Sequence, residues 1–473
     1  MNAPRFRVAE LELYERPVRL RLPFRFGAAT LRAAQQAFVR ARIRLAGGRE
    51  AHGAAAELLA PKWFDKDPAL SDEDNANQLR SSLALAREGY LAGGANTAFG
   101  HFRAHYAEQI KAAAGRGLNA LVANYGPALV DRALLDALCR AHGLSFYAAL
   151  RANLPGIELS GWLAELARFD MSAFLASLEP QPAIAARHTV GLADPLVAAD
   201  QPARVNDGLP ETLEEVIARY GNRHFKLKLS GELAADVERL AAIAAVLERI
   251  DGRYQVTLDG NEQYEDVEGV LALWRRLAAE RRLRRLAASV LYVEQPIKRQ
   301  AALAQRVSKL AAEVPVIIDE SDDSLEAFAR ARTLGYAGVS SKSCKGVYRS
   351  LINRARCELW NRAARDARYF VAGEDLTVQA GLALQQDLAL ASLLGLEHVE
   401  RNGHHYVNGM AGLPDAEQAA FHMAHPDLYE NSHGAVRVAI RDGLLAIGSL
   451  DCAGFASRAM PDWRVTRRVR YGD

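Results

Sequence analysis

Apolar and polar residues alternate with period two in the first 60 residues, and the pattern then becomes helical. Segments 8–14 and 38–45 alternate as half-buried strands do, and Gly47-Gly48 after the second predicts a turn. From about residue 70 to residue 153, apolar residues recur at helical spacing. The first third of the chain is therefore predicted to be an α+β unit.

A different sequence pattern begins at residue 187, where short apolar runs that end in polar residues alternate with helical segments. Alternation at this spacing predicts parallel β/α units, and eight strands suit a closed TIM-type (β/α) barrel. A doubly wound open sheet is the alternative, but its usual glycine-rich first turn is missing. The expected strands are His188–Leu192, His224–Leu229, Gln255–Asp259, Val290–Glu294, Val314–Asp319, Gly338–Lys342, Arg368–Glu374 and His398–Asn402.

These patterns divide the chain into three parts. We expect an α+β capping domain at 1–153, an insertion or connection at 154–186, and an α/β barrel domain at 187–473. The C-terminal tail could return to the cap. The 473 residues, half of them hydrophobic, are enough for such a two-part molecule.

Charge changes this picture little. A formal net charge of +2 gives no overall attraction to nucleic acid or to an anionic membrane. Arg275–Arg285 is the local exception, and its apolar residues at helical spacing favour the solvated face of a long helix over a nucleic-acid patch. We therefore expect no nucleic-acid or membrane partner.

The four cysteines lie far apart without CxxC spacing, so reduced thiols are expected rather than a zinc site or a disulfide framework. The first residues show no apolar core of a signal peptide, and no apolar run approaches the roughly 20 residues that cross a bilayer. A cytoplasmic protein is expected.

Charged residues follow the apolar approach of five successive predicted strands. Barrel active sites lie at the C-terminal ends of the strands, so Asp259, Glu294 and Asp319 should converge from three neighbours. Three close carboxylates repel unless a cation neutralises them, and all-oxygen ligation favours Mg²⁺. The alternative is that each acid is an independent helix cap or salt-bridge partner.

Three lysines stand at the same end of the predicted barrel. Lys226 and Lys228 are two apart on one strand, so both face the interior, and Lys342 ends a strand on the far side. Near a second lysine and a metal ion the pKa of such a lysine is expected to fall, which would make a base available. Salt bridges to the three acids are the alternative role.

The segments FKLKLSG, VTLDGNEQY, YVEQPI, VIIDES and SSKSCKG occur in this order. They resemble the KxK, DxN, ExP, DES and KxxK elements of the enolase superfamily, specifically its muconate-lactonizing-like branch within the mandelate racemase/muconate lactonizing enzyme family. The resemblance is specific across residues 220–350 and looser elsewhere.

This resemblance implies a Mg²⁺-dependent isomerase or lyase that removes the α-proton of a carboxylate substrate and passes through an enediolate. Racemisation or epimerisation, cycloisomerisation and β-elimination are all compatible with it. A small-molecule carboxylate substrate and a homo-oligomer are expected. The implied roles are Mg²⁺ ligands for Asp259, Glu294 and Asp319, acid–base catalysis for Lys228 and Lys342 with support from Lys226, and second-shell or substrate contacts for Asn261, Glu320, Lys345, Glu374, Glu400 and Arg25.

Departures from the family pattern reduce the number of reactions that fit this sequence. Gly373-Glu374-Asp375 stands where a histidine would end the seventh strand, and Lys342 stands where an aspartate would end the sixth. Both argue against the His–Asp dyad of mandelate racemase and of acid-sugar dehydratases. Glu400-Arg401-Asn402 lacks the paired aspartates expected for dipeptide epimerisation. An acid-sugar dehydratase and a non-catalytic metal-binding barrel are the remaining alternatives.

Four further features have two possible roles each. His404 and His405 could touch substrate or lie in an exposed loop, and Cys344 could be an activated thiol or pack behind its strand. Phe24-Arg25-Phe26 could close over the site, with Arg25 meeting an anionic substrate, or form a simple hairpin turn. Trp63-Phe64 could join that lid or pack between the domains.

Overall fold

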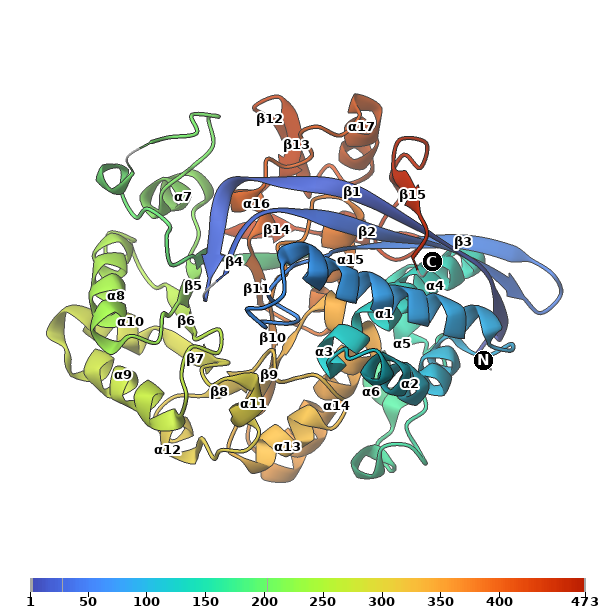
Figure 1. Cartoon of the computed structure of the whole chain (residues 1–473), viewed down its shortest axis with the longest axis horizontal. Helices are drawn as coiled ribbons and strands as arrows, with labels where there is room; N and C mark the ends of the chain where they lie inside the picture. Colours follow the sequence, from blue (N-terminus) through green and yellow to red (C-terminus); the bar gives the residue numbers. More distant parts are fainter. Residues whose placement is uncertain (1–2, 28, 202, 472–473) are drawn as a thin grey trace.

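The computed structural model of the chain describes residues 3–27, 29–201 and 203–471. Figure 1 shows a long antiparallel sheet lying across one end of a barrel, with helices α8 to α14 around the barrel wall. The chain begins in the sheet and returns to it at its C-terminal end, where β15 pairs with β1.

The N-terminal sheet has the strand order β15-β1-β2-β3, and its neighbouring strands are antiparallel. Helix α4 packs against β3 so closely that a Cβ at Gly53 would lie 2.2 Å from the backbone nitrogen of Ala137, so this contact requires glycine. The elements are β1 (Phe6–Phe26), β2 (Ala29–Leu45), β3 (Glu50–Leu58), α1 (Asp72–Ala92), α2 (Ala98–Gly115), α3 (Ala120–Ala123), α4 (Tyr125–His142), α5 (Phe146–Arg151) and β15 (Arg467–Val469).

Eight parallel strands form the barrel, which closes because β11 pairs with β4. The predicted fold class, a modified TIM barrel with an α+β cap, is confirmed. The first strand begins at Ala183 rather than at His188, and β14 (Leu444–Ala446) pairs antiparallel with it. The strands are β4 (Ala183–Val190), β5 (His224–Lys228), β6 (Gln255–Asp259), β7 (Val290–Glu294), β8 (Val316–Ile318), β9 (Gly338–Ser341), β10 (Phe370–Gly373) and β11 (His398–Arg401).

The basic segment around residue 280 does not form the single long helix that its pattern suggested. Helix α9 ends at Ala279, and Glu280 in extended conformation separates it from a short 3₁₀ turn and from α10. The helical elements around the barrel are α7 (Leu213–Tyr220), α8 (Leu233–Leu247), α9 (Val267–Ala279), η3 (Arg281–Leu283), α10 (Arg284–Ala288), α11 (Arg299–Ala302), α12 (Ser308–Ala311), α13 (Ala327–Thr333), η4 (Ser343–Lys345), α14 (Val347–Ala364) and α15 (Leu382–Leu393).

The remaining elements connect or follow these units. No helix among the described residues is long and apolar enough to cross a membrane. The elements are η1 (Ala164–Leu166), α6 (Met171–Ala176), η2 (Ala198–Asp200), α16 (Gly403–Tyr406), α17 (Asp415–Ala424), β12 (Tyr429–Ser432), β13 (Ala435–Val438) and η5 (Gly448–Leu450).

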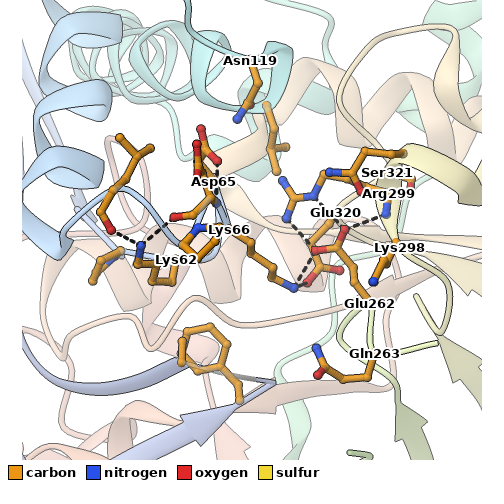
Figure 2. A pocket seen from close by; sticks show the side chains of 18 of the residues that line it. Lys62, Asp65, Lys66, Asn119, Glu262, Gln263, Lys298, Arg299, Glu320 and Ser321 are labelled. Atoms are coloured by element: carbon orange, nitrogen blue, oxygen red, sulfur yellow. Dashed lines mark hydrogen bonds and ion pairs between the residues drawn. The ribbon is translucent and has the colours of Figure 1, made fainter. Parts of the chain in front are cut away.

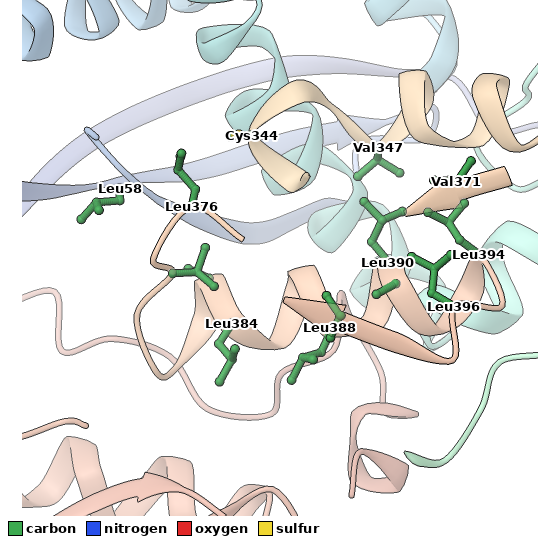
Figure 3. Close-up of a cluster of buried hydrophobic side chains, with 14 of the residues drawn as sticks. Leu58, Cys344, Val347, Val371, Leu376, Leu384, Leu388, Leu390, Leu394 and Leu396 are labelled. Atoms are coloured by element: carbon green, nitrogen blue, oxygen red, sulfur yellow. The ribbon is translucent and has the colours of Figure 1, made fainter. Parts of the chain in front are cut away.

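Helix α15 is buried along its whole length and joins the barrel core to the cap. Figure 3 shows Leu390 of this helix lying toward Val371 of β10 and Val347 of α14, with Leu384 and Leu388 on another face of the helix. Gln386 of the same helix donates a hydrogen bond of 2.8 Å to the carbonyl of Ala54 in β3. Cap and barrel are therefore continuous through α15.

Candidate active site at the mouth of the barrel

Lys226 and Lys228 both point into the barrel, because side chains two residues apart on a strand share a face. Both are buried. The Lys226 ammonium lies at the centre of four carboxylates that come from four strand ends. Its Nζ is 2.9 Å from Asp259, 2.8 Å from Glu294, 2.7 Å from Glu374 and 3.0 Å from Glu400.

Lys228 and Lys342 line one cavity beneath the cap. Each ammonium is paired with one carboxylate and faces one aromatic ring. Lys228 lies 2.6 Å from Asp259 and 5.9 Å from the centre of the Phe24 ring. Lys342 lies 2.7 Å from Asp319 and 4.2 Å from the centre of the Trp63 ring. The two lysines therefore have matching environments.

The cavity is small, about 30 Å³, and its cap side is apolar. Phe24 and Phe26 of β1 contribute to it, whereas Arg25 is exposed and is not among the lining residues. The alternation of a strand accounts for this, since Phe24 and Phe26 share the inward face. The other lining residues are Leu31, Ala60, Trp63, Asn261, Asp375, Leu376, Thr377, Glu400 and Asn402.

Asp259 and Glu294 are neighbours in register on β6 and β7, and Asp319 follows β8. All three are buried. Burial, together with the carboxylates of Asp259 and Glu374, raises the pKa of Glu294 well above its usual range. The neighbouring acids thus outweigh the single ammonium of Lys226 at Glu294, and three carboxylates are suitable donors for a hard divalent cation.

The arrangement of these acids does not itself form a metal site. Within residues 3–27, 29–201 and 203–471, no three acidic, histidine or cysteine side chains are placed to hold a metal ion. Asp259 is engaged by Lys226 and Lys228, and Asp319 by Lys342. The donors fit Mg²⁺ in kind, and its binding would require these ion pairs to rearrange.

The carboxylates around the lysines act against the fall in lysine pKa that was expected beside a second lysine and a metal ion. Burial would lower the pKa of Lys226, but Asp259 and Glu294 outweigh burial and raise it. In the same way, Asp319 raises the pKa of Lys342 against the effect of burial. The neighbouring lysines were expected to dominate, but buried carboxylates lie closer to each ammonium.

Asn261 and Glu320 lie beside the carboxylates and are held by the cap. Lys66, in the loop between β3 and α1, lies 3.0 Å from Glu320 and 2.6 Å from Glu262, and donates to the carbonyl of Asn261 at 3.0 Å. Figure 2 shows this Lys66 bridge at the wall of a cleft of about 1070 Å³ between cap and barrel. Glu320 faces this larger cleft, and Asn261 lines the lysine cavity.

The other expected site residues lie deeper or to one side. Glu374 contacts Arg187 and accepts a hydrogen bond of 2.9 Å from Tyr292, beneath Lys226. Glu400 lines the cavity and accepts from Thr189 at 2.6 Å. Lys345 contacts Ser340, Asp319 and Asp322 and is not among the cavity-lining residues.

The histidine and cysteine candidates are separate from the lysine cavity. The rings of His404 and His405 pack around His188, with centres 5.5 Å and 4.9 Å from it, and neither residue lines the cavity. Cys344 is buried in the core, where burial and Glu57 raise the pKa of its thiol well above the usual range. These observations support a packing role for Cys344 and argue against an activated thiol.

Several residues of the site were missed by sequence reasoning. Asp375 immediately follows a predicted strand and Asn402 ends one, so their positions did carry a signal. Lys66 and Arg299 carried none, because their partners are distant in sequence. Arg299 forms an ion pair with Glu262 at 2.8 Å and donates to the carbonyls of Trp63 and Phe64, both at 2.8 Å.

Comparison with known proteins adds a match over the barrel. Residues 208–416, from the loop before α7 into α17, match the family model described as Enolase C-terminal domain-like. A search of curated proteins finds no match to this chain.

Solved structures share the fold over nearly the whole chain. A mandelate racemase/muconate lactonizing protein from Herpetosiphon aurantiacus is 18% identical, with a TM-score of 0.60, covering 96% of this chain and 99% of that one. A muconate lactonizing enzyme from Mycobacterium smegmatis, complexed with muconolactone, is 16% identical, with a TM-score of 0.60 and coverage of 98% and 100%. A dipeptide epimerase from Enterococcus faecalis V583, complexed with Mg and the dipeptide L-Leu-L-Tyr, is 15% identical, with a TM-score of 0.59 and coverage of 95% and 99%.

At these identities the solved structures show the fold, and the family match adds the kind of barrel. The family match covers less than half of the chain, and beyond residues 208–416 the likeness is one of fold.

Proposed function

We propose that the protein catalyses Mg²⁺-dependent removal of the α-proton of a carboxylate substrate, with Lys228 and Lys342 as the acid–base pair. Racemases, epimerases and muconate lactonizing enzymes among the similar folds support this general kind of reaction and an isomerase or lyase class. The specific pairing of lysines is our own inference from the cavity.

One observation carries the proposal. In the closed ring from β4 to β11, strands β5 and β9 are four places apart in either direction. Lys228 is the last residue of β5 and Lys342 directly follows β9, and both line the same cavity. The cavity of about 30 Å³ must widen to admit a substrate. A substrate between the two lysines would then have one lysine on each face, which suits proton removal from one face and return to the other.

The other polar groups of the site are assigned to metal binding and to electrostatic support. We infer that Asp259, Glu294 and Asp319 hold the Mg²⁺, which when bound would neutralise the substrate carboxylate and the negative charge that follows proton loss. Lys226, fixed by Glu374 and Glu400, adds positive charge beneath this position. The roles of Asn261 and Glu320 are to support these acids, and the cap contributes the water-excluding wall.

The lining of the cavity favours one group of outcomes. Phe24, Phe26, Leu31 and Trp63 give an apolar wall, and no lining residue is a histidine. This suits racemisation, epimerisation or cycloisomerisation of a carboxylate with an apolar substituent better than dehydration of a polyhydroxy acid. A non-catalytic barrel would leave two buried lysines facing one cavity without a task. We also propose self-association, which light scattering would test.

The test is exchange of the α-proton with solvent. The protein would be incubated with Mg²⁺ in D₂O and a panel of amino, hydroxy, aromatic and unsaturated carboxylic acids, and loss of the α-proton signal would be followed by NMR. Lys228→Ala, Lys342→Ala and Asp319→Asn should each abolish the exchange. Lys309→Ala, an exposed lysine paired with Glu268, should leave it unchanged.

Magnesium binding would be measured by calorimetry on the same samples. Binding of Mg²⁺ to the wild type that is lost in Asp319→Asn, together with exchange lost in both lysine variants, would support the proposal. Exchange that survives Lys228→Ala and Lys342→Ala would refute the acid–base assignment. Failure of the wild type to bind Mg²⁺ would refute the metal site and the mechanism with it.

A further inference from the structure

A second hollow lies at the opposite end of the barrel from the lysine cavity. Its lining includes His224, Gln255 and Val290, which are the first residues of β5, β6 and β7, and its volume is about 530 Å³. Lys228, Asp259 and Glu294 are the last residues of the same three strands. The hollow is therefore separated from the proposed active site by the length of the barrel.

Three arginines line this hollow, and none of its lining residues is an aspartate or a glutamate. Arg223 donates to the carbonyls of Asp251 at 2.5 Å and Arg253 at 3.3 Å. Arg285 donates to carbonyls at Glu248, Ile250 and Gly252. These carbonyls orient the guanidinium groups but carry no net charge, so the positive charge is not neutralised.

Arginines nearby in the sequence differ in this respect. Arg275 forms an ion pair with Glu313 at 3.2 Å, and Arg276 pairs with Glu280 at 3.3 Å. Both lie outside the hollow, on the helical surface where a solvated charged face was expected. Arg281 and Arg284 also make no ion pair among the described residues, but they lie outside the hollow. Arg223, Arg253 and Arg285 differ from them because their three guanidinium groups surround one concave surface, which suits an anion.

Carboxylates near the hollow reduce its positive electrostatic potential, but they do not line it. Three carboxylates lie outside the lining: that of Asp251, that of Glu397, whose charge acts on His224, and that of Glu248, whose charge acts on Tyr254. Burial lowers the pKa of His224, and the nearby Arg187 lowers it further, so the three arginines supply the positive charge of the hollow.

The remaining wall combines an aromatic ring with apolar surface. The Arg285 guanidinium lies 4.8 Å from the centre of the Tyr254 ring, which fixes its plane. Tyr254 is buried, and its hydroxyl makes no well-formed hydrogen bond with any residue that the structure describes. Ala288, Val290 and Leu291 complete the lining. The hollow thus offers both fixed donors and a contact surface for an organic group.

We propose that this arginine hollow (Arg223, Arg253 and Arg285 around Tyr254) binds a small organic phosphate monoester. A phosphate dianion with three acceptor oxygens matches guanidinium donors in charge and geometry. The apolar wall contacts the organic group, and the volume admits more than a free phosphate ion. This proposal does not depend on the proposed catalytic function, because it uses none of the groups at the barrel mouth.

The experiment uses phenyl phosphate as the probe, titrated into the full-length protein by calorimetry at fixed ionic strength without added Mg²⁺. Arg253→Gln removes one guanidinium whose side chain makes no hydrogen bond among the described residues, so the fold should be kept, and thermal melting checks this. Arg284→Gln is the matched control, an exposed arginine of α10 outside the hollow. Inorganic phosphate and benzoate test the organic group and the second charge.

We expect one phenyl phosphate per chain, bound about tenfold more weakly by Arg253→Gln because a charge-assisted hydrogen bond is lost, and with unchanged affinity by Arg284→Gln. Inorganic phosphate and benzoate should both bind more weakly than phenyl phosphate. Absence of binding at millimolar probe would overturn the proposal. Equal weakening in both variants would assign binding to general surface charge, and affinity lost only in Lys342→Ala would assign it to the lysine cavity, and either result overturns the proposal.

Discussion

The Ser343 hydroxyl donates a hydrogen bond of 3.1 Å to Oε2 of Glu57, which joins the residue after Lys342 to cap strand β3. The same Glu57 oxygen accepts from Arg132 of α4 at 3.0 Å, and the Ser343 backbone N–H donates to Asp387 of α15 at 3.1 Å. All these groups are buried. The position of Lys342 is therefore set by the cap and by α15 as well as by its own strand.

Replacing Ser343 with alanine should loosen Lys342 without removing any charge. We expect amide hydrogen exchange in the peptide spanning 338–350 to become about fivefold faster, since one hydrogen bond of about 1 kcal/mol is lost. Proton exchange of any accepted substrate should slow, with Mg²⁺ affinity unchanged. Ser392→Ala is the control, because this buried serine donates to the carbonyl of Gln181 elsewhere in the barrel. Equal exchange in both variants would show that Glu57 does not position the loop.

Magnesium should stabilise the folded protein through the strand-end acids. A ligand that binds only the native state at a hundred times its Kd adds about 2.7 kcal/mol to the free energy of unfolding. We therefore expect Mg²⁺ to raise the Tm of the wild type. Asp259→Asn and Glu294→Gln should remove this rise, and Asp442→Asn, a turn residue at the surface, should keep it. A Tm that rises equally in all variants would place the ion elsewhere.

The Lys66 bridge should stabilise the closed cap. Lys66→Met leaves the buried carboxylate of Glu320 without its cation, and we expect a loss of about 1–3 kcal/mol in the free energy of unfolding. Adding Glu320→Gln should recover part of this loss, because the amide carries no charge to neutralise. Urea unfolding of both single variants and the double variant measures the coupling. Strictly additive losses would mean that the bridge contributes nothing.

Strand positions could be predicted from the sequence, but the partners of the charged groups could not. Alternation and apolar runs report which face a side chain takes, and this placed Lys226, Lys228 and Asp259 at the mouth. The same alternation was not applied to Arg25, which was expected to contact substrate but is exposed, while Phe24 and Phe26 line the cavity. The bridge from Lys66 to Glu320 links residues 254 positions apart. Such contacts depend on how cap and barrel pack, which local pattern does not report.

The carboxylates that act on the pKa of Lys226 could not be identified from the sequence for a related reason. From sequence, Lys226 has a near neighbour in Lys228, and the carboxylates lie tens of residues away. In the barrel Glu374 and Glu400, from the last two strand ends, lie within 3.0 Å of its ammonium. A pKa depends on distances in space and on burial. The charged residues at the strand ends could therefore be predicted, whereas their net effect on the pKa of Lys226 could not.

The stability of the cap should depend on pH through Asp131. Burial raises the pKa of this carboxyl well above its usual range, and among the described residues its hydrogen-bond partner is the Tyr90 hydroxyl, which donates at 2.7 Å. A raised native pKa means that the folded state binds the proton more tightly than the unfolded state. The stability contribution is therefore present below the ordinary aspartate pKa and is lost as pH rises toward the native pKa.

Asp131→Asn can keep the acceptor for Tyr90 and has no charge to bury. We expect its free energy of unfolding, relative to wild type, to increase between about pH 5 and about pH 8. Urea unfolding across that range measures it. Asp136→Asn is the contrast: Asp136 accepts from the backbone of Ala54 and Phe455 and from Arg140, so its loss should destabilise at every pH. A constant difference between Asp131→Asn and wild type would mean that Asp131 does not titrate in this range.

The α15 leucines should carry a large share of the stability that joins cap and barrel. Leu388 is fully buried in the cluster of Figure 3, so Leu388→Ala should lower the free energy of unfolding by about 2–5 kcal/mol, through lost burial and the cavity left behind. Leu233→Ala, at a leucine that is 44% exposed at the start of α8, should change it by less than about 0.5 kcal/mol. Denaturant unfolding of both variants tests this. If cap and barrel unfold as one unit, the Leu388→Ala transition stays single and shifts as a whole, whereas two separated transitions would show that α15 does not couple them.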